Sequence, residues 1–350
     1  GCDGLNGMIP NKYFEGCTNL VDIHGHFQNC TGLSGVIPTD FWSDCRNIAD
    51  ASYLFSGCTG LGGTSSLQEI PTNFFEGKYR LDNANYMFND CNQLQFLLQS
   101  EWFKDCRLLT KISSIFSGCT NAAGEIPPDL FTVRDENGEI METVMLEAAG
   151  VFYNCRYLNG EIPSNLFEKF LKVRDLSNFF YNCLNLQGGI PDELFANCYQ
   201  VTNINSMFYR CEKLGKYSDE ITEENPYFCS EYLFMNCTNL MYVNNVFNMY
   251  NVESQENLAG EIPPTLFMTC SKLEELSYTF AHCNKLTGGL DGQLFARCPK
   301  LKVCSGTFYG CSGLNGEISG ALFSDKNNPN ITTFVECFTG CSNLKGNAPT

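Results

Sequence analysis

Apolar and polar positions follow one pattern that recurs along the chain. In the segment 201–208 the first, fourth and eighth residues are apolar, and the second, third and fifth are polar. A short strand with one buried edge, followed by a turn that drops its last residue into the interior, has this pattern. We therefore expect one short parallel strand in each repeat. The other copies include 20–27, 81–88, 109–116, 173–180, 240–247 and 273–280.

A longer phrase connects these segments. It reads Phe-x-x-Cys-x-x-Leu-x-Gly-x-Ile-Pro-x-x-Leu-Phe-x-x-Cys at 180–198, and its first cysteine recurs in steps of 28 residues, as from Cys30 to Cys58 and from Cys183 to Cys211. Proline cannot donate to a strand ladder, so we expect the Gly-x-Ile-Pro return to be extended or briefly helical and not a paired central strand. The period predicts an α/β solenoid of about 11–12 coils of ~28 residues, filling 1–350 as one unit.

Two halves of the repeat resemble known families. The strand half at 201–214, Val-Thr-Asn-Ile-Asn-Ser-Met-Phe-Tyr-Arg-Cys-Glu-Lys-Leu, resembles the BspA-like leucine-rich repeats of bacterial and protist surface proteins. It is most similar to the Met-Phe-x-x-Cys-x-x-Leu variety of mycoplasma-type surface lipoproteins. The return half at 158–166 resembles the Leu-x-Gly-x-Ile-Pro-x-x-Leu segment of plant-type leucine-rich repeats. The resemblance implies a leucine-rich-repeat fold, an extracellular or cell-surface location, and recognition or adhesion.

The net charge limits the classes of partner, and the chain ends bear on the extent of the protein. The net charge of −17 argues against nucleic acids and anionic membranes, which both call for basic patches. No apolar run has the length of a membrane-spanning helix, so we expect no membrane insertion within this segment. The chain starts and stops in mid-repeat without polar caps, which solenoids need at their ends. We therefore expect it to be a slice of a longer protein.

The twenty-one cysteines predict a ladder of buried thiols. Without a Cys-x-x-Cys pair and with only three histidines, the chain offers no metal site, and we expect no cofactor. Equivalent cysteines on stacked coils would have Cβ atoms ~4.8 Å apart, outside disulfide range. Three cysteines lie off the pattern: Cys229, Cys304 and Cys337. Of these, Cys229 lies in the longest insertion and is the one expected to be paired or reactive.

The sequence contains few groups of residues that could form an active site. His24 and His26 share a segment with Cys30, but that cysteine belongs to the core ladder, so a nucleophilic pair is not expected. Asp22 and Asp50 would stack closely enough for glycosidase-like chemistry, yet no other feature supports an enzyme. The sequence predicts a non-enzymatic protein.

The strand face is the candidate binding surface. Its third position is a polar column, acidic in parts, which either binds cations or a basic peptide or is simply solvated. The fifth position is small and polar with tyrosines beside it, which suits hydrogen bonding and stacking to a sugar or an extended peptide. Insertions at 64–68, 132–143, 215–230 and 251–255 should emerge as loops, often on the binding face. The candidate residues are Asp22, His24, Asp50, Tyr53, Asn83, Tyr86, Asp175, Asn203, Tyr217, Tyr227 and Tyr242.

We conclude from the sequence that the chain is a recognition or adhesion module for a protein, peptide or glycan. A structural spacer, fibre or assembly subunit with possible self-association is the alternative, and a glycan-active enzyme is a distant one. A binder should show clustered aromatics and loops on one face, whereas a spacer should have an even polar coat.

Overall fold

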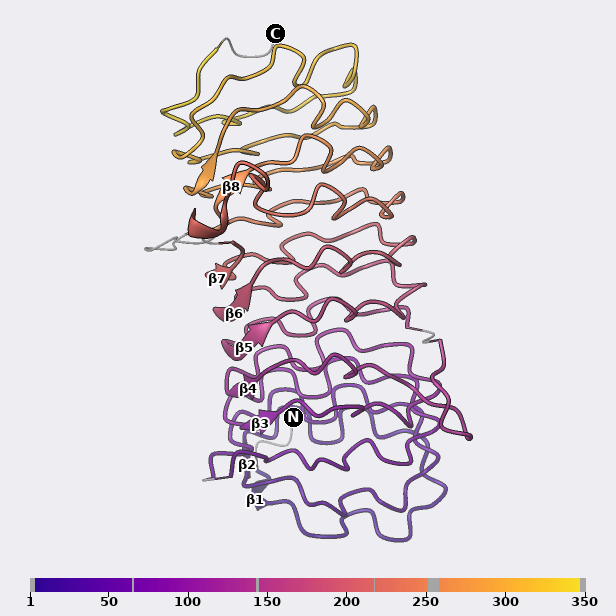
Figure 1. Cartoon of the computed structure of the whole chain (residues 1–350). Helices are drawn as coiled ribbons and strands as arrows, with labels where there is room; N and C mark the ends of the chain where they lie inside the picture. The colour runs from indigo at the N-terminus through magenta and orange to yellow at the C-terminus, as the bar shows by residue number, and fades with distance from the viewer. Residues whose placement is uncertain (1–3, 65, 143–144, 217, 251–257, 347–350) are drawn as a thin grey trace. The chain divides into compact units, whose positions relative to one another are not determined.

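The computed structural model describes residues 4–64, 66–142, 145–216, 218–250 and 258–346. The chain divides into two compact units, one of residues 1–160 with 169–171 and one of residues 161–168 with 172–350. Each unit is a stack of coils that follow the same course (Figure 1). The predicted solenoid is confirmed, while its extent as a single unit over 1–350 stays a prediction.

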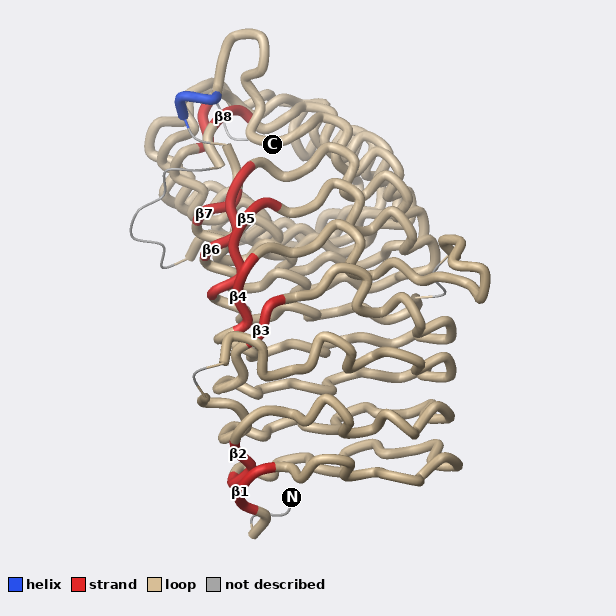
Figure 2. The backbone as a smooth tube through the Cα atoms, turned by 60° about the horizontal axis from the view of Figure 1, so that its bottom comes forward, coloured by secondary structure: helices blue, strands red, loops and turns tan. Residues whose placement is uncertain are grey.

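Short parallel strands lie in the return stretch of the repeat, which the sequence predicted to be unpaired. In the first unit β1 pairs with β2, β3 with β4, and β4 with β5; in the second unit β6 pairs with β7 and β8 with β9. The prediction was wrong because proline limits only its own position: β2 and β5 end before the Ile-Pro steps at 37–38 and 162–163. The strands, red in Figure 2, are β1 (Asn6–Met8), β2 (Gly32–Ser34), β3 (Phe96–Leu97), β4 (Ala122–Gly124), β5 (Tyr157–Glu161), β6 (Asn185–Gly188), β7 (Lys213–Leu214), β8 (Gly260–Glu261) and β9 (Leu286–Thr287).

The segment expected to be the strand pairs in parallel but is kinked. Its third residue forms a single-residue bridge to the next coil, as between Asp22 and Asp50. Alternate N–H groups donate to the next coil, including Ile23 N to Asp50 O at 2.9 Å and Gly25 N to Ser52 O at 2.8 Å. Between these bonds the chain turns on itself, with His26 N donating to Ile23 O at 3.2 Å. Coils are thus held together by backbone bonds without a continuous strand.

Left-handed residues cause the kinks. Two residues of the coil have positive φ: the sixth residue of the segment and the tenth, which lies two positions past the segment's end. Examples are Tyr53 (55°) with Gly57 (74°) and Tyr86 (57°) with Asp90 (59°). This conformation costs an L-residue roughly 1–2 kcal/mol, less for Asn and Asp and nothing for Gly. The neighbouring coils must therefore hold such residues in place.

Stacked phenylalanines and buried thiols form the core of each unit. In the first unit the rings of Phe27, Phe55, Phe88, Phe116 and Phe152 stack at centroid distances of 5.6–6.1 Å and within 11° of parallel. In the second unit an equivalent column runs from Phe180 to Phe338 at 5.5–5.9 Å.

A cysteine thiol closes most steps of these columns, while Tyr250 occupies the cysteine position in the step from Phe208 to Phe247. Cys58 Sγ donates to Phe27 O at 2.9 Å, and Cys119 Sγ donates to Phe88 O at 3.1 Å. The same bond recurs in the second unit from Cys311 to Phe280 O at 2.9 Å. No disulfide joins any cysteine in the described part of the chain, as the buried-thiol prediction required.

The expectation for Cys229 was wrong. Its side chain is 2% exposed and unpaired, and burial raises the pKa of its thiol well above the usual value. A thiol is nucleophilic only as the thiolate, so this residue is inert at neutral pH. Cys304 and Cys337 are buried as well.

Turns replace the helical part of the α/β prediction. Within the described residues the helical element is a single 3₁₀ turn, η1 (Ser218–Glu220). No described helix has the length and apolar character needed to cross a bilayer. The returns instead use i to i+3 bonds, such as Phe41 N to Pro38 O at 3.1 Å.

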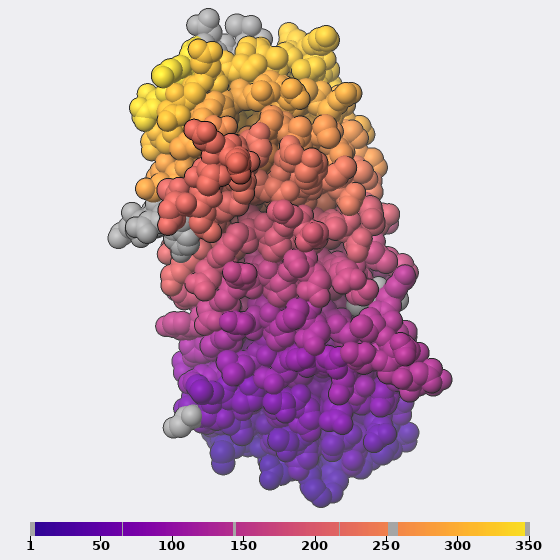
Figure 3. Space-filling model, in the orientation of Figure 1, coloured from indigo at the N-terminus to yellow at the C-terminus, as the bar shows by residue number. Residues whose placement is uncertain are grey.

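The insertions leave the coils as loops. Residues 132–142 project from the surface in magenta (Figure 3), with an antiparallel bridge between Arg134 and Ile140. The loop at 216–228 is tied back to its own unit because Tyr227 pairs with Glu261. Residues 251–255 lie outside the described ranges.

Candidate functional site

A shallow groove runs across four coils of the strand face in the first unit. The second-place residues stack directly, since Ala49 N donates to Val21 O at 2.7 Å, Asp82 N to Ala49 O and Thr110 N to Asp82 O, both at 2.9 Å. The groove has a volume of about 630 Å³ and an apolar floor. Its lining consists of Val21, Asn47, Ala49, Arg80, Asp82, Leu108 and Thr110.

Two apolar side chains of the groove are open to solvent. Val21 is 51% exposed and Leu108 is 52% exposed. Arg80 and Asp82 add one charge of each sign between them. The combination of apolar contact area with a few placed polar groups is what peptide and small-molecule sites use.

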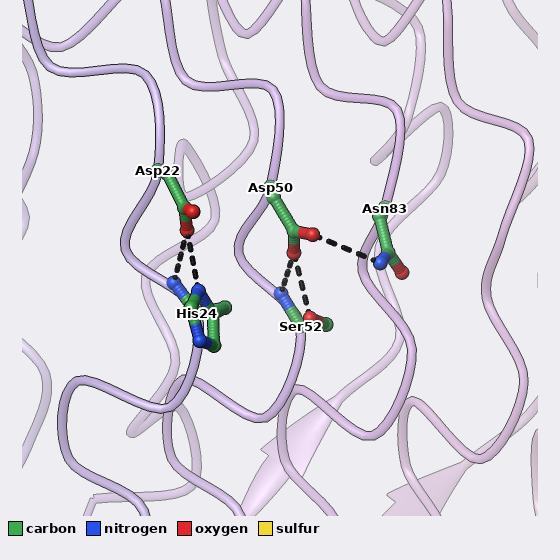
Figure 4. A network of polar contacts seen from close by, with 5 residues as sticks. All are labelled: Asp22, His24, Asp50, Ser52 and Asn83. Carbon is green, nitrogen blue, oxygen red and sulfur yellow. Dashed lines mark hydrogen bonds and ion pairs between the residues drawn. The ribbon is translucent and has the colours of Figure 1, made fainter.

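The residues of the predicted polar column directly follow residues that line this groove, since Asp22 follows Val21 and Asp50 follows Ala49. Figure 4 shows the first members of the column. Asp22 Oδ1 accepts hydrogen bonds from the backbone N and the Nδ1 of His24 at 2.9 and 2.8 Å. Asp50 Oδ1 accepts from the N and Oγ of Ser52 at 2.8 and 2.6 Å, and its Oδ2 accepts from Asn83 Nδ2 at 3.1 Å.

The column therefore has a local structural role. In each case the side-chain oxygen holds the N–H two residues on, which is the Asx-turn arrangement. The same bond joins Asn83 to Asn85 N at 3.1 Å, Asp175 to Ser177 N at 2.8 Å and Asn203 to Asn205 N at 3.0 Å. Third-place Asp and Asn thus initiate the kink, whatever else they bind.

Asp22 and His24 form an exposed ion pair at the edge of the column. The hydrogen bond from His24 N, followed by the one from its ring, lowers the pKa of Asp22. The side-chain bond to Asp22 raises the pKa of His24. Asp22 is consequently a stable carboxylate at neutral pH, available to a basic group of a partner.

The tyrosines beside the column stack on one another. The rings of Tyr53 and Tyr86 are 4.8 Å apart and 7° from parallel, and Tyr53 is 37% exposed. Each ring covers one face of the other, so their edges and hydroxyls are what a ligand meets first. This arrangement favours hydrogen bonding over the stacking of a sugar.

The remaining candidates lie in the second unit. Bridges connect Asp175 to Asn203 and Asn203 to Tyr242, all three partly exposed. Tyr227 is half-buried, and its carbonyl accepts a hydrogen bond from Lys216 Nζ at 3.0 Å. Tyr217 lies outside the described residues. The predicted residues thus belong to both units.

The groove itself was missed from the sequence. The repeat pattern gives the second place of the segment as polar, but Val21 and Ala49 occupy it in two coils. Leu108 lies two residues before the second place of a later coil. An exposed apolar residue recurring at a solvent-facing repeat position was the available signal. No cluster of three or more His, Cys, Asp or Glu that could hold a metal occurs in the described part of the chain.

One protein family matches part of the chain. The family is described as Mycoplasma protein of unknown function, DUF285, and its sequence model matches residues 146–263. This is about a third of the chain, spanning the later coils of the first unit and the earlier ones of the second. In the comparison with curated proteins, none matched.

Several solved structures match the chain over most of its length. A plant ice-binding protein matches with 16% identity over 98% of this chain and 78% of its own, at a TM-score of 0.43. A leucine-rich repeat protein from Bacteroides ovatus has 19% identity over 97% and 81%, at a TM-score of 0.25. The Drosophila Toll–Spatzle complex has 12% identity over 89% of this chain and 38% of the Toll–Spatzle chain, at a TM-score of 0.36. We draw nothing about ligands from them.

Proposed function

We propose that the strand face of the first unit binds an extended segment of a protein partner. The observation that carries this proposal is the groove across four coils with exposed Val21 and Leu108 in its floor. An exposed apolar strip bordered by polar groups is typical of an interaction site. The chain acts on this proposal as a recognition or adhesion module at the cell surface or outside the cell, as its resemblance to surface-protein repeats implies.

The chemistry of the border indicates the kind of segment. Asp22 is an exposed carboxylate with a lowered pKa, and the chain carries a net charge of −17. A peptide with apolar side chains at alternate positions and a basic residue between them would place the former in the groove and the latter on Asp22. A glycan is the less favoured ligand because the stacked pair leaves only one face of each tyrosine ring for a sugar.

The test uses a phage-displayed random peptide library with the whole chain as bait, beside a glycan array. Selected peptides should share apolar and basic positions, and the double variant Val21→Glu, Leu108→Glu should weaken them at least tenfold. Both residues are more than half exposed, so the fold should tolerate the change. Ile140→Glu, a matched change at an exposed apolar residue of the 132–142 loop, should leave binding unchanged.

Other outcomes would count against the proposal. Peptides that bind the double variant as tightly as the original chain would move the site elsewhere. Binding on the glycan array alone would favour a carbohydrate receptor. No ligand in either screen would support the structural spacer.

A further inference from the structure

A second column of cysteines lies between those of the ladder and includes Cys17, Cys45 and Cys106. A buried lysine interrupts this second cysteine column. Cys45 and Cys106 occupy this slot in the coils before and after, and Lys78 stands between them with 1% of its surface exposed. Burying an ammonium group costs several kcal/mol unless it is well paired. A thiol would fill the slot without this cost, so the lysine calls for an explanation.

The ammonium group is only partly satisfied. Lys78 Nζ donates to Trp42 O at 3.0 Å and to Glu76 O at 3.3 Å, and it lies 5.0 Å from the centroid of the Trp42 ring. An ammonium has three N–H donors, so one remains for another acceptor. Burial lowers the pKa of Lys78, which is the expected sign for a charge without a carboxylate partner.

A hollow of about 260 Å³ opens beside this lysine. Tyr79 is 37% exposed and supplies an aromatic wall, while Trp42 lines the hollow with only 3% of its surface exposed. Arg46 is exposed, and its guanidinium has no ion-pair partner within the described ranges. Arg46 and Lys78 bring two cations to the hollow, Glu76 brings one carboxylate, and the Asp105 carboxylate accepts a hydrogen bond from Gly77 N of the lining at 2.7 Å.

The walls are fixed in advance. Trp42 Nε1 donates to Phe74 O at 2.7 Å, which sets the plane of the indole. The guanidinium of Arg107 lies 4.8 Å from the Tyr79 ring centroid and restrains that ring. Preorganised groups lose little entropy when a ligand arrives, so even a small ligand can bind measurably.

We propose that this hollow binds a small planar carboxylic acid. The carboxylate would accept hydrogen bonds from Arg46 and from the third N–H of Lys78, while its flat body lies between Trp42 and Tyr79. A neutral analogue would leave the positive charges without a partner. Arg46 and Lys78 line no part of the strand-face groove, so this site is separate from the proposed function.

The chain carries a built-in reporter. It has two tryptophans, and Trp42 lines the hollow while Trp102 does not. Trp102 Nε1 is buried with no hydrogen-bond partner in the described structure, so Trp102→Phe breaks no hydrogen bond and keeps an aromatic ring among the phenylalanines that pack against it, at the cost of some ring volume. In that variant all tryptophan fluorescence comes from Trp42. Benzoate should change it in a saturable way, and benzamide should bind at least tenfold more weakly at the same ionic strength.

Two variants and a control decide the residues involved. Arg46→Gln and Lys78→Cys should each weaken benzoate about tenfold, the usual loss for a hydrogen bond to a charged group. Lys78→Cys restores the residue of the neighbouring coils, so its thermal unfolding should match the original. Arg297→Gln removes an equally exposed arginine from another hollow in the second unit and should change nothing.

Two results would contradict the proposal that the hollow binds a carboxylic acid. Equal binding of benzoate and benzamide, or affinity within twofold of the original in both variants, would mean that Lys78 is only an internal tie between coils. Should Lys78→Cys fail to fold, Arg46→Gln alone decides, because Arg46 is exposed. Loss of benzoate binding says nothing about the peptide groove, and the two proposals can fail independently.

Discussion

At the residue scale, the same few atoms do the same work in coil after coil. A ladder cysteine is small enough to fit between stacked rings, and its thiol gives a phenylalanine carbonyl a second hydrogen bond beside the one from a backbone N–H. The pair Cys119 and Phe88 O, at 3.1 Å, is representative. Cysteine therefore acts here as a small apolar residue with one weak donor.

The contribution of one thiol can be measured. Cys119→Ala should lower the free energy of unfolding by about 1–3 kcal/mol, because it leaves a small cavity and removes one of the two hydrogen bonds to Phe88 O, the other coming from Cys91 N at 3.1 Å. Cys17→Ala, at an exposed cysteine of the second column, should change it by less than about 0.5 kcal/mol. Chemical denaturation of both variants checks this, and equal losses would mean that the buried thiol contributes nothing specific.

At the element scale, the coil is a kinked parallel ladder and not a strand. Two left-handed residues bend each copy of the segment, and third-place Asp or Asn side chains hold the first bend. Gly57 and Gly118 occupy the tenth place with φ of 74° and 73°. The bends keep Phe and Cys pointing inward while the backbone continues to bond to the next coil.

Two glycines separate strain from crowding. Gly77 has φ of 69° and nothing within 4 Å of an added Cβ, so Gly77→Ala should cost only the backbone strain of about 1 kcal/mol. At Gly118 an added Cβ would lie 2.3 Å from Asp90 Oδ1 and 3.1 Å from Asp90 Cα. Gly118→Ala should therefore cost clearly more in thermal or chemical unfolding, and an equal cost would show that Asp90 moves aside freely.

The sequence predicted the solenoid, its period and its buried thiols, because spacing and residue type carry that information directly. It misplaced the strands, since Ile-Pro suggested an unpaired return whereas β5 and its relatives pair just before the proline. It gave the column of Asp22 and Asp50 as either a binding surface or a solvated face, and could not show that both carboxylates accept hydrogen bonds from backbone N–H groups two residues on. The groove and the Lys78 hollow were not predicted, because they depend on side chains from four coils and from two coils, respectively, meeting in space.

At the scale of the whole molecule, burial shifts the pKa of many thiols in the same direction. Burial raises the pKa of Cys58, Cys198, Cys211 and Cys270 to about 12 in each case. In an unfolded chain a thiol loses its proton near pH 8.5. A folded pKa raised above the unfolded one gives stability that is complete below the unfolded value and is lost as pH rises toward the folded value.

The protein should consequently unfold in alkali. Its free energy of unfolding should be flat up to about pH 8 and then fall, with each buried thiol contributing up to about 1.4 kcal/mol per pH unit. Cys198→Ala should make this fall shallower by one thiol's share. Urea titrations at several pH values measure the slope, and a slope that Cys198→Ala leaves unchanged would assign the alkaline loss to other groups.

Because nearly all hydrogen bonds between coils join direct neighbours, with Asn85 Nδ2 to Glu147 Oε2 at 2.9 Å as an exception, the fold has a mechanical consequence. A force applied to one end of a unit meets the bonds of a single interface, and the remaining interfaces carry no extra load until that one opens. Coils should then peel away one at a time, each releasing a 28-residue repeat. The released length is on the order of 90 Å of extended chain per step. A molecule built this way would yield in small, nearly equal increments and absorb sustained tension without losing its structure at once.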